Sequence, residues 1–134
     1  MELARAAAPD QTRVHRVVSD VPIRDHQTCE LSLEIVESTP IGSLRVDVNI
    51  EHSYRGDLRV RLRPPATLQL PPISLHEWQG RAATNLRRIY DEATTPALSG
   101  LRGLDPNGRW TLEVSDRATR DEGQIAHFGL ELDG

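Results

Sequence analysis

Apolar and polar residues alternate along several short stretches of this chain, which is the pattern of half-buried β-strands. The longest stretch is 43–51, where every second side chain is apolar. The same period of two recurs at 29–35, 58–62, 109–114 and 128–132. We therefore predict a strand in each stretch, with 43–51 and 58–62 as antiparallel neighbours.

Proline and glycine mark the turns between these strands. Residues 105–108 read Asp-Pro-Asn-Gly, in which proline presets a type I turn and glycine closes it, so a strand begins there. The pattern weakens between 64 and 103, where two Pro-Pro pairs flank Leu68 and Leu70. In that region we expect only a short edge strand at these two leucines and a helical turn at 85–90.

No stretch of ten or more residues has the period of an amphipathic helix. The sequence therefore predicts an all-β fold, an antiparallel β-sandwich of jelly-roll type with its C-terminal strand held inside a sheet. We expect residues 1–13 to be a linker or tail and residues 14–134 to form the sandwich, with the first element starting near Val14. The predicted core consists of Leu31, Leu33, Val46, Val48, Leu58, Val60, Leu62, Trp110, Leu112, Val114 and Phe128.

The length of 134 residues suits one domain. The net charge of −4, from 16 arginines without any lysine and 20 acidic residues, disfavours nucleic acid or an anionic membrane as a partner. No apolar run is long enough to span a membrane, and no secretory signal is visible at residues 1–10. The lone cysteine, Cys29, continues an apolar face, so we interpret it as a buried filler rather than a reactive thiol.

The residue types for hydrolytic or metal chemistry are poorly arranged. Five histidines are present, but there is no Gly-x-Ser-x-Gly elbow and no clustered His/Cys set for zinc. The neighbours His52 and Ser53 are placed in a loop, where adjacency in sequence does not make a catalytic pair. The remaining histidines are interpreted as solvent-exposed: His15, His26, His76 and His127.

Two sets of charged residues could serve binding. Arg59, Arg61 and Arg63 share one face of a strand and could hold an acidic partner, or they could pair with acids across the sheet. Acidic residues also gather in predicted loops and strand ends, where they could bind calcium or cap turns. The acids concerned are Asp57, Asp91, Glu92, Asp105, Asp116, Asp121 and Glu122.

Several ordered motifs resemble the P domain, or Homo B domain, which follows the subtilisin-like catalytic domain of kexin- and furin-type proprotein convertases and of many bacterial proteases. The motifs are His-Ser-Tyr-Arg-Gly-Asp-Leu at 52–58, Tyr-Asp-Glu-Ala at 90–93, the run from 105 to 116, and Gly123 before a closing strand. The resemblance extends from about Val21 to Leu132. It departs from the family at 64–67, where Pro-Pro-Ala-Thr replaces a glycine-containing hairpin.

This resemblance implies a non-catalytic accessory module that packs on and stabilises a partner catalytic domain, most directly a subtilisin-like serine endopeptidase. It implies a protein partner and no catalytic residue in this chain. The location stays open, and it is extracellular if the domain belongs to a secreted protease. The resemblance also implies calcium as a candidate cofactor, with Asp57, Asp91, Glu92 and Asp116 as candidate ligands. The alternatives are a free-standing sandwich that binds a protein or glycan and, less favoured, a small enzyme.

Overall fold

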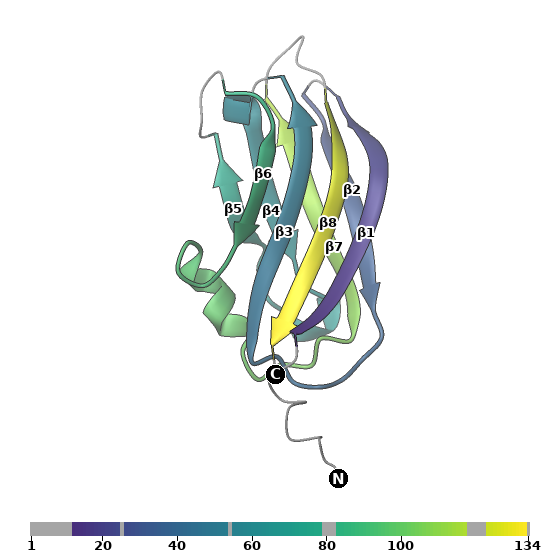
Figure 1. The fold of residues 1–134 in the computed structure, drawn as a ribbon, viewed down its shortest axis with the longest axis vertical. Helices are drawn as coiled ribbons and strands as arrows, with labels where there is room; N and C mark the ends of the chain where they lie inside the picture. The colour runs from purple at the N-terminus through teal and green to yellow at the C-terminus, as the bar shows by residue number, and fades with distance from the viewer. Residues whose placement is uncertain (1–11, 25, 54, 79–82, 118–122, 134) are drawn as a thin grey trace.

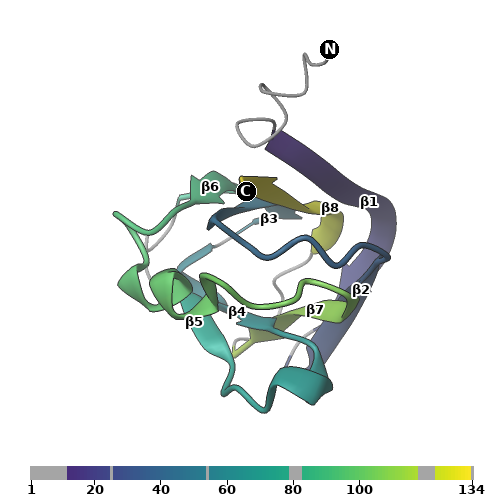
Figure 2. The ribbon, with the colours of Figure 1, turned by 90° about the horizontal axis from the view of Figure 1, so that it is seen from below.

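Two four-stranded antiparallel sheets pack face to face in the computed structural model, which describes residues 12–24, 26–53, 55–78, 83–117 and 123–133 (Figure 1). The front sheet in Figure 1 has the order β1-β8-β3-β6, and the rear sheet has the order β2-β7-β4-β5. Figure 2 shows the two layers from below. The strands are β1 Thr12–Ile23, β2 Thr28–Ile35, β3 Ser43–His52, β4 Leu58–Arg63, β5 Ile73–Glu77, β6 Leu86–Tyr90, β7 Gly108–Asp116 and β8 Gly123–Asp133. The expected sandwich is confirmed, but β3 and β4, predicted as antiparallel neighbours, lie in different sheets.

The core lies between the sheets and is built from the alternating apolar faces of their strands. All eleven predicted core residues are buried. Trp110 is among the largest fully buried side chains, and its indole Nε1 donates a hydrogen bond of 2.9 Å to the Pro106 carbonyl. That carbonyl belongs to the predicted 105–108 turn, in which Asp105 Oδ1 also accepts a hydrogen bond from the Asn107 amide. The turn thereby places the largest core side chain.

The region between 64 and 103 differs from the prediction. Leu68 ends a short 3-10 helix, η3 (Ala66–Leu68), and the edge strand follows it as β5. Residues 86–90 form β6, which pairs with β3, instead of a helical turn. The alternation of β6 is hidden because Arg87, Arg88 and Ile89 are all exposed at the edge of the sheet. Edge strands tolerate such a sequence, since only one side of the strand is paired.

The first and the last strand both lie in the front sheet. Strand β1 begins at Thr12, two residues before the expected start, so the last two residues of the tail predicted at 1–13 belong to a strand, and residues 1–11 lie outside the described residues. Strand β8 lies between β1 and β3, as expected for the C-terminal strand. A Cβ atom on Gly123 would collide with the Glu51 carbonyl, so the start of β8 requires glycine. In the described part of the chain, no helix is long and apolar enough to cross a membrane.

Candidate functional site

The four carboxylates predicted as calcium ligands divide into two pairs at opposite ends of the sandwich. Asp116 lies beside His52, the last residue of β3, whereas Asp91 follows Tyr90, which pairs with Val46 near the start of β3. These positions on β3 are six residues apart, or roughly 20 Å along an extended strand. Calcium holds its oxygen ligands at about 2.3 to 2.6 Å, so one ion cannot be surrounded by all four residues.

Asp91 and Glu92 make contacts within their own end of the molecule. Asp91 Oδ1 accepts a hydrogen bond of 2.9 Å from the Thr94 amide, and this bond is the main reason that the pKa of Asp91 lies below its usual value. Glu92 accepts two hydrogen bonds from Arg102 Nε, at 3.0 and 2.9 Å, and the pair lowers the pKa of Glu92. Asp91 therefore caps a turn, and Glu92 forms an ion pair.

The other two acids lie at the upper end in Figure 1, where β3 and β7 end. Asp57 closes the short helix η2 (Arg55–Asp57), and its Oδ1 lies 3.6 Å from Arg117 Nε. Asp116 Oδ2 lies 3.1 Å from His52 Nε2, and both side chains are completely buried. Within the described residues, no three His, Cys, Asp or Glu side chains lie together in a way that could hold a metal ion. The calcium assignment to these four residues stays a prediction, and on this geometry it requires two separate sites.

The buried His52–Asp116 pair is a feature that sequence reasoning missed. His52 continues the inward face of β3 two residues after Ile50, and Asp116 continues the inward face of β7 two residues after Val114. Strand parity could therefore have placed both side chains in the interior. His76, interpreted as solvent-exposed, is also buried, because Val60 faces it in the register of β4 with β5.

The remaining histidines and the cysteine have more ordinary surroundings. His26 is exposed as expected, and His15 is half-buried with Nε2 at 2.6 Å from Glu37 Oε2. His127 Nε2 lies 3.1 Å from Asp47 Oδ1 on the outer face of the front sheet. Cys29 packs partly against the core, and burial raises the pKa of its thiol to about 11, which favours the filler interpretation over a reactive thiolate.

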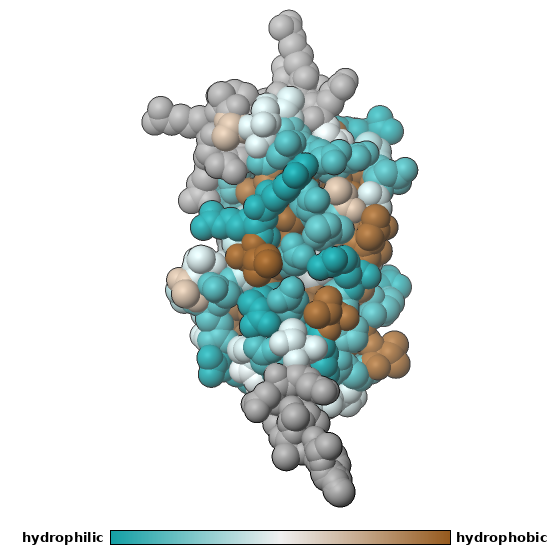
Figure 3. Space-filling view, in the orientation of Figure 1, coloured by the Kyte–Doolittle hydropathy of each residue, from teal (hydrophilic) through white to brown (hydrophobic). Residues whose placement is uncertain are grey.

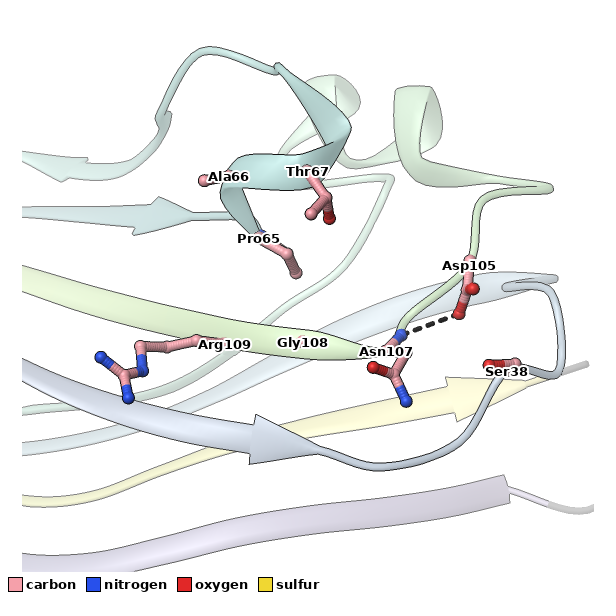
Figure 4. A pocket seen from close by; sticks show the side chains of 8 residues that line it. All are labelled: Ser38, Pro65, Ala66, Thr67, Asp105, Asn107, Gly108 and Arg109. Carbon is pink, nitrogen blue, oxygen red and sulfur yellow. Dashed lines mark hydrogen bonds between the residues drawn. The ribbon is translucent and has the colours of Figure 1, made fainter.

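The described surface has a large open pocket at the lower end of the sandwich, with a volume of about 590 Å³ (Figure 4). Figure 4 shows Ser38 and Asn107 on one side and Thr67 with Pro65 on the other. The one cationic side chain in its lining, Arg109, donates a hydrogen bond of 2.7 Å to Glu34. The pocket offers hydroxyl and amide groups without a nucleophile and base in contact, which is not the arrangement of a hydrolytic centre.

Comparison with known proteins decides the family. The family model described as the proprotein convertase P-domain matches residues 41–132. The chain belongs to this family. The P domain is 46% identical over 132 residues to a calcium-dependent protease of a Nostoc species. The aligned region covers 98% of this chain but only 20% of that protein. It is 38% identical over 112 residues, 80% of the chain and 23% of the relative, to leupeptin-inactivating enzyme 1 of Streptomyces exfoliatus. The chain thus spans about a fifth of the length of these two relatives.

Solved structures support the same fold. The P domain superposes on part of the Aeromonas sobria serine protease with a TM-score of 0.66 and 15% identity, covering 96% of this chain and 28% of that chain. It also resembles part of a β-porphyranase from Bacteroides plebeius, with a TM-score of 0.54 and 12% identity over 91% of this chain and 20% of that one. Since the sandwich occurs in proteins of different activity, the family match and not the fold carries the function.

Proposed function

We propose that this P domain is a non-catalytic module that packs on and stabilises a protease catalytic domain, most directly that of a subtilisin-like serine endopeptidase. The single observation that carries the proposal is the match to a calcium-dependent protease, which takes in nearly the whole of this chain but only a fifth of the relative. The remaining four fifths of that relative leave room for a separate catalytic domain on which such a domain can pack.

The residues of the domain are consistent with this role. The pairing of His52 with Asp116 is closed off from solvent, so it cannot meet a substrate. The sequence also lacks the Gly-x-Ser-x-Gly elbow on which α/β-hydrolases present their serine nucleophile. We therefore assign peptide cleavage to a separate catalytic domain.

Calcium belongs to the same proposal at the level of the longer protein. The relatives from Nostoc and Trichormus variabilis are named calcium-dependent proteases, which supports calcium as a cofactor of a protease that carries this domain. The four carboxylates of this chain do not form one calcium site, so no step of the proposed role depends on an ion held by them.

Two measurements test the role. First, the purified chain is incubated with casein and with dibasic peptides, and we expect no hydrolysis. Second, the segment that matches this chain is deleted from the Nostoc protease, and we expect the truncated enzyme to lose soluble yield. Steady cleavage by the isolated chain, abolished by replacing one serine or histidine, would contradict the proposal, as would a truncated protease that folds and cleaves as well as the intact one.

A further inference from the structure

A group of side chains gathers on the outer face of the rear sheet, around the start of β4 and the ends of β5 and β7, and these strand ends lie at the upper end in Figure 1. The guanidinium carbon of Arg117 lies 4.5 Å from the centre of the Trp78 ring, and that of Arg59 lies 5.6 Å from it. Arg61 is the next outward residue on β4 after Arg59. We name Arg59, Arg61, Trp78 and Arg117 the arginine–tryptophan cluster.

The backbone holds Trp78 in this position. Its φ angle is 55°, in the left-handed region that bulky residues rarely adopt, and its amide donates a hydrogen bond of 2.9 Å to the Leu58 carbonyl. The amide of Arg117 likewise donates to the Asp57 carbonyl at 3.0 Å. The backbone that carries Trp78 and Arg117 is therefore anchored beside the start of β4 before any ligand arrives, which lowers the entropy lost on binding.

The charges on this face are unevenly matched. Arg63 forms ion pairs with Glu113 and Glu30. At Arg63, the alternative that these arginines pair with acids across the sheet is therefore confirmed. Arg59 and Arg61 have no carboxylate partner among the described residues, although Glu77 and Glu113 lie opposite them in the strand register. Arg59 Nε is buried with no hydrogen-bond acceptor in the described part of the chain.

Arg117 is also weakly engaged. Its Nε lies 3.6 Å from Asp57 Oδ1, and its terminal nitrogen lies 3.4 Å from the Gly56 carbonyl, both longer than a strong charge-assisted hydrogen bond. About half of its side chain is exposed, so the guanidinium can reach a ligand. The guanidinium groups of Arg59 and Arg117 beside the indole ring, and that of Arg61 further along β4, thus have unused capacity for carboxylate oxygens.

We infer that the arginine–tryptophan cluster is a docking site for an acidic segment of the protein partner, which presents glutamate or aspartate side chains to these three arginines. The inference rests on the proposed function, because it names the chemistry of the surface that the partner would offer. Guanidinium groups bind carboxylates in a bidentate geometry. Tryptophan and arginine are also among the side chains that contribute most to the binding energy at protein interfaces. An apolar docking surface on the front sheet is less favoured, because the outer face of that sheet is mostly polar in Figure 3, with small, separate apolar spots.

The binding test uses the purified chain and an acetylated, amidated tetrapeptide of glutamate, with the glutamine tetrapeptide as the uncharged control. Titration calorimetry at low ionic strength measures the dissociation constant. We expect Arg59→Gln and Arg117→Gln each to weaken glutamate-peptide binding about tenfold. The matched control is Arg109→Gln, which removes one exposed arginine that is already paired with Glu34, and it should bind as the parent does.

Fluorescence locates the site, because the only other tryptophan, Trp110, is buried in the core. We expect the glutamate peptide to change the emission of the parent but not of Trp78→Phe. Equal binding of the glutamine peptide, equal losses in Arg109→Gln and Arg117→Gln, or tighter binding of a single-stranded oligonucleotide than of the glutamate peptide would each overturn the inference. These outcomes leave the stabilising role untouched, since that role is measured on the truncated protease.

Discussion

His52 Nε2 lies 3.1 Å from Asp116 Oδ2, and neither side chain has any exposed surface. His52 ends β3 in the front sheet, and Asp116 ends β7 in the rear sheet, so the pair links the two layers of the sandwich at its upper end. The neighbourhood is tightly built, since Asn85 Oδ1 accepts a hydrogen bond of 3.0 Å from the His52 amide. A buried polar pair of this kind stabilises the fold only while both partners are present.

Replacing one partner of this pair should therefore be costly. We expect Asp116→Ala to lower the free energy of unfolding by about 3 kcal/mol or more, because it removes the carboxylate that contacts the buried His52 ring. The control is Glu34→Ala, which breaks the exposed ion pair with Arg109 and should cost less than about 1 kcal/mol. Urea denaturation measures both, and equal losses would show that the buried pair has no special weight.

Trp110 should be the most sensitive position of the core. Its side chain is fully buried and its indole is bonded to the Pro106 carbonyl. We expect Trp110→Ala to cost about 3 to 5 kcal/mol, from a large cavity and a lost hydrogen bond. Trp78→Ala removes the same side chain from a half-buried surface position and should cost clearly less. Thermal melts that rank the two variants in the opposite order would contradict this assignment.

Acid should weaken the hydrogen bonds that hold the end of β8 in the front sheet. Hydrogen bonds from Arg45 and Thr12 lower the pKa of Asp133 from 3.8 to about 2. Because the folded state lowers this pKa, the contribution of Asp133 is complete above its unfolded value and is lost as the pH falls through about 4 to about 2. We expect Asp133→Asn to be less stable than the parent at neutral pH and to lose less on acidification. Urea denaturation across this pH range measures the free energy of unfolding of both proteins. The same pH dependence in the two proteins would contradict the prediction.

The role of Asp91 can be decided by two substitutions. If Asp91 caps its turn, Asn can still accept the Thr94 amide, so Asp91→Asn should melt like the parent, whereas Asp91→Ala should melt lower. The difference in melting temperature between each variant and the parent should be the same in millimolar calcium and in EGTA, with magnesium as the control for ionic strength. A loss in Asp91→Asn that is confined to calcium would instead assign this carboxylate to an ion.

Much of the fold could be predicted because alternation encodes it. Strands buried on one face, such as β3 and β7, repeat their apolar residues with a period of two. The apolar side of such a strand must face the core, because a shift of one residue in the register would turn all of its apolar side chains to solvent. Two of the edge strands, β5 and β6, were missed for a physical reason. Strand β6 exposes three successive residues, and β5 follows directly after Pro71 and Pro72, so neither carries the inward–outward pattern of a central strand.

The site was harder to predict, because residues gather there through the sheet register rather than through sequence. Asp91 and Asp116 both lie at strand ends, but β6 and β7 end at opposite ends of the sandwich, which counting of loop acids cannot reveal. The same limit applies to Trp78, whose contact with Arg117 joins residues 39 positions apart along the chain. By contrast, the motifs that resemble the P domain lie in fixed order along the sequence, and the family match over 41–132 confirms them.

The most direct test of the stabilising role is the rate of thermal inactivation of a chimaeric protease. The segment of the Nostoc calcium-dependent protease that matches this chain is replaced by residues 1–134, and peptide hydrolysis is followed over time at raised temperature. If this domain stabilises a catalytic domain, the chimaera will inactivate at nearly the rate of the parent protease and far more slowly than the version without the segment. Inactivation of the chimaera at the rate of the deleted form, with the inserted domain itself folded by circular dichroism, would contradict that role.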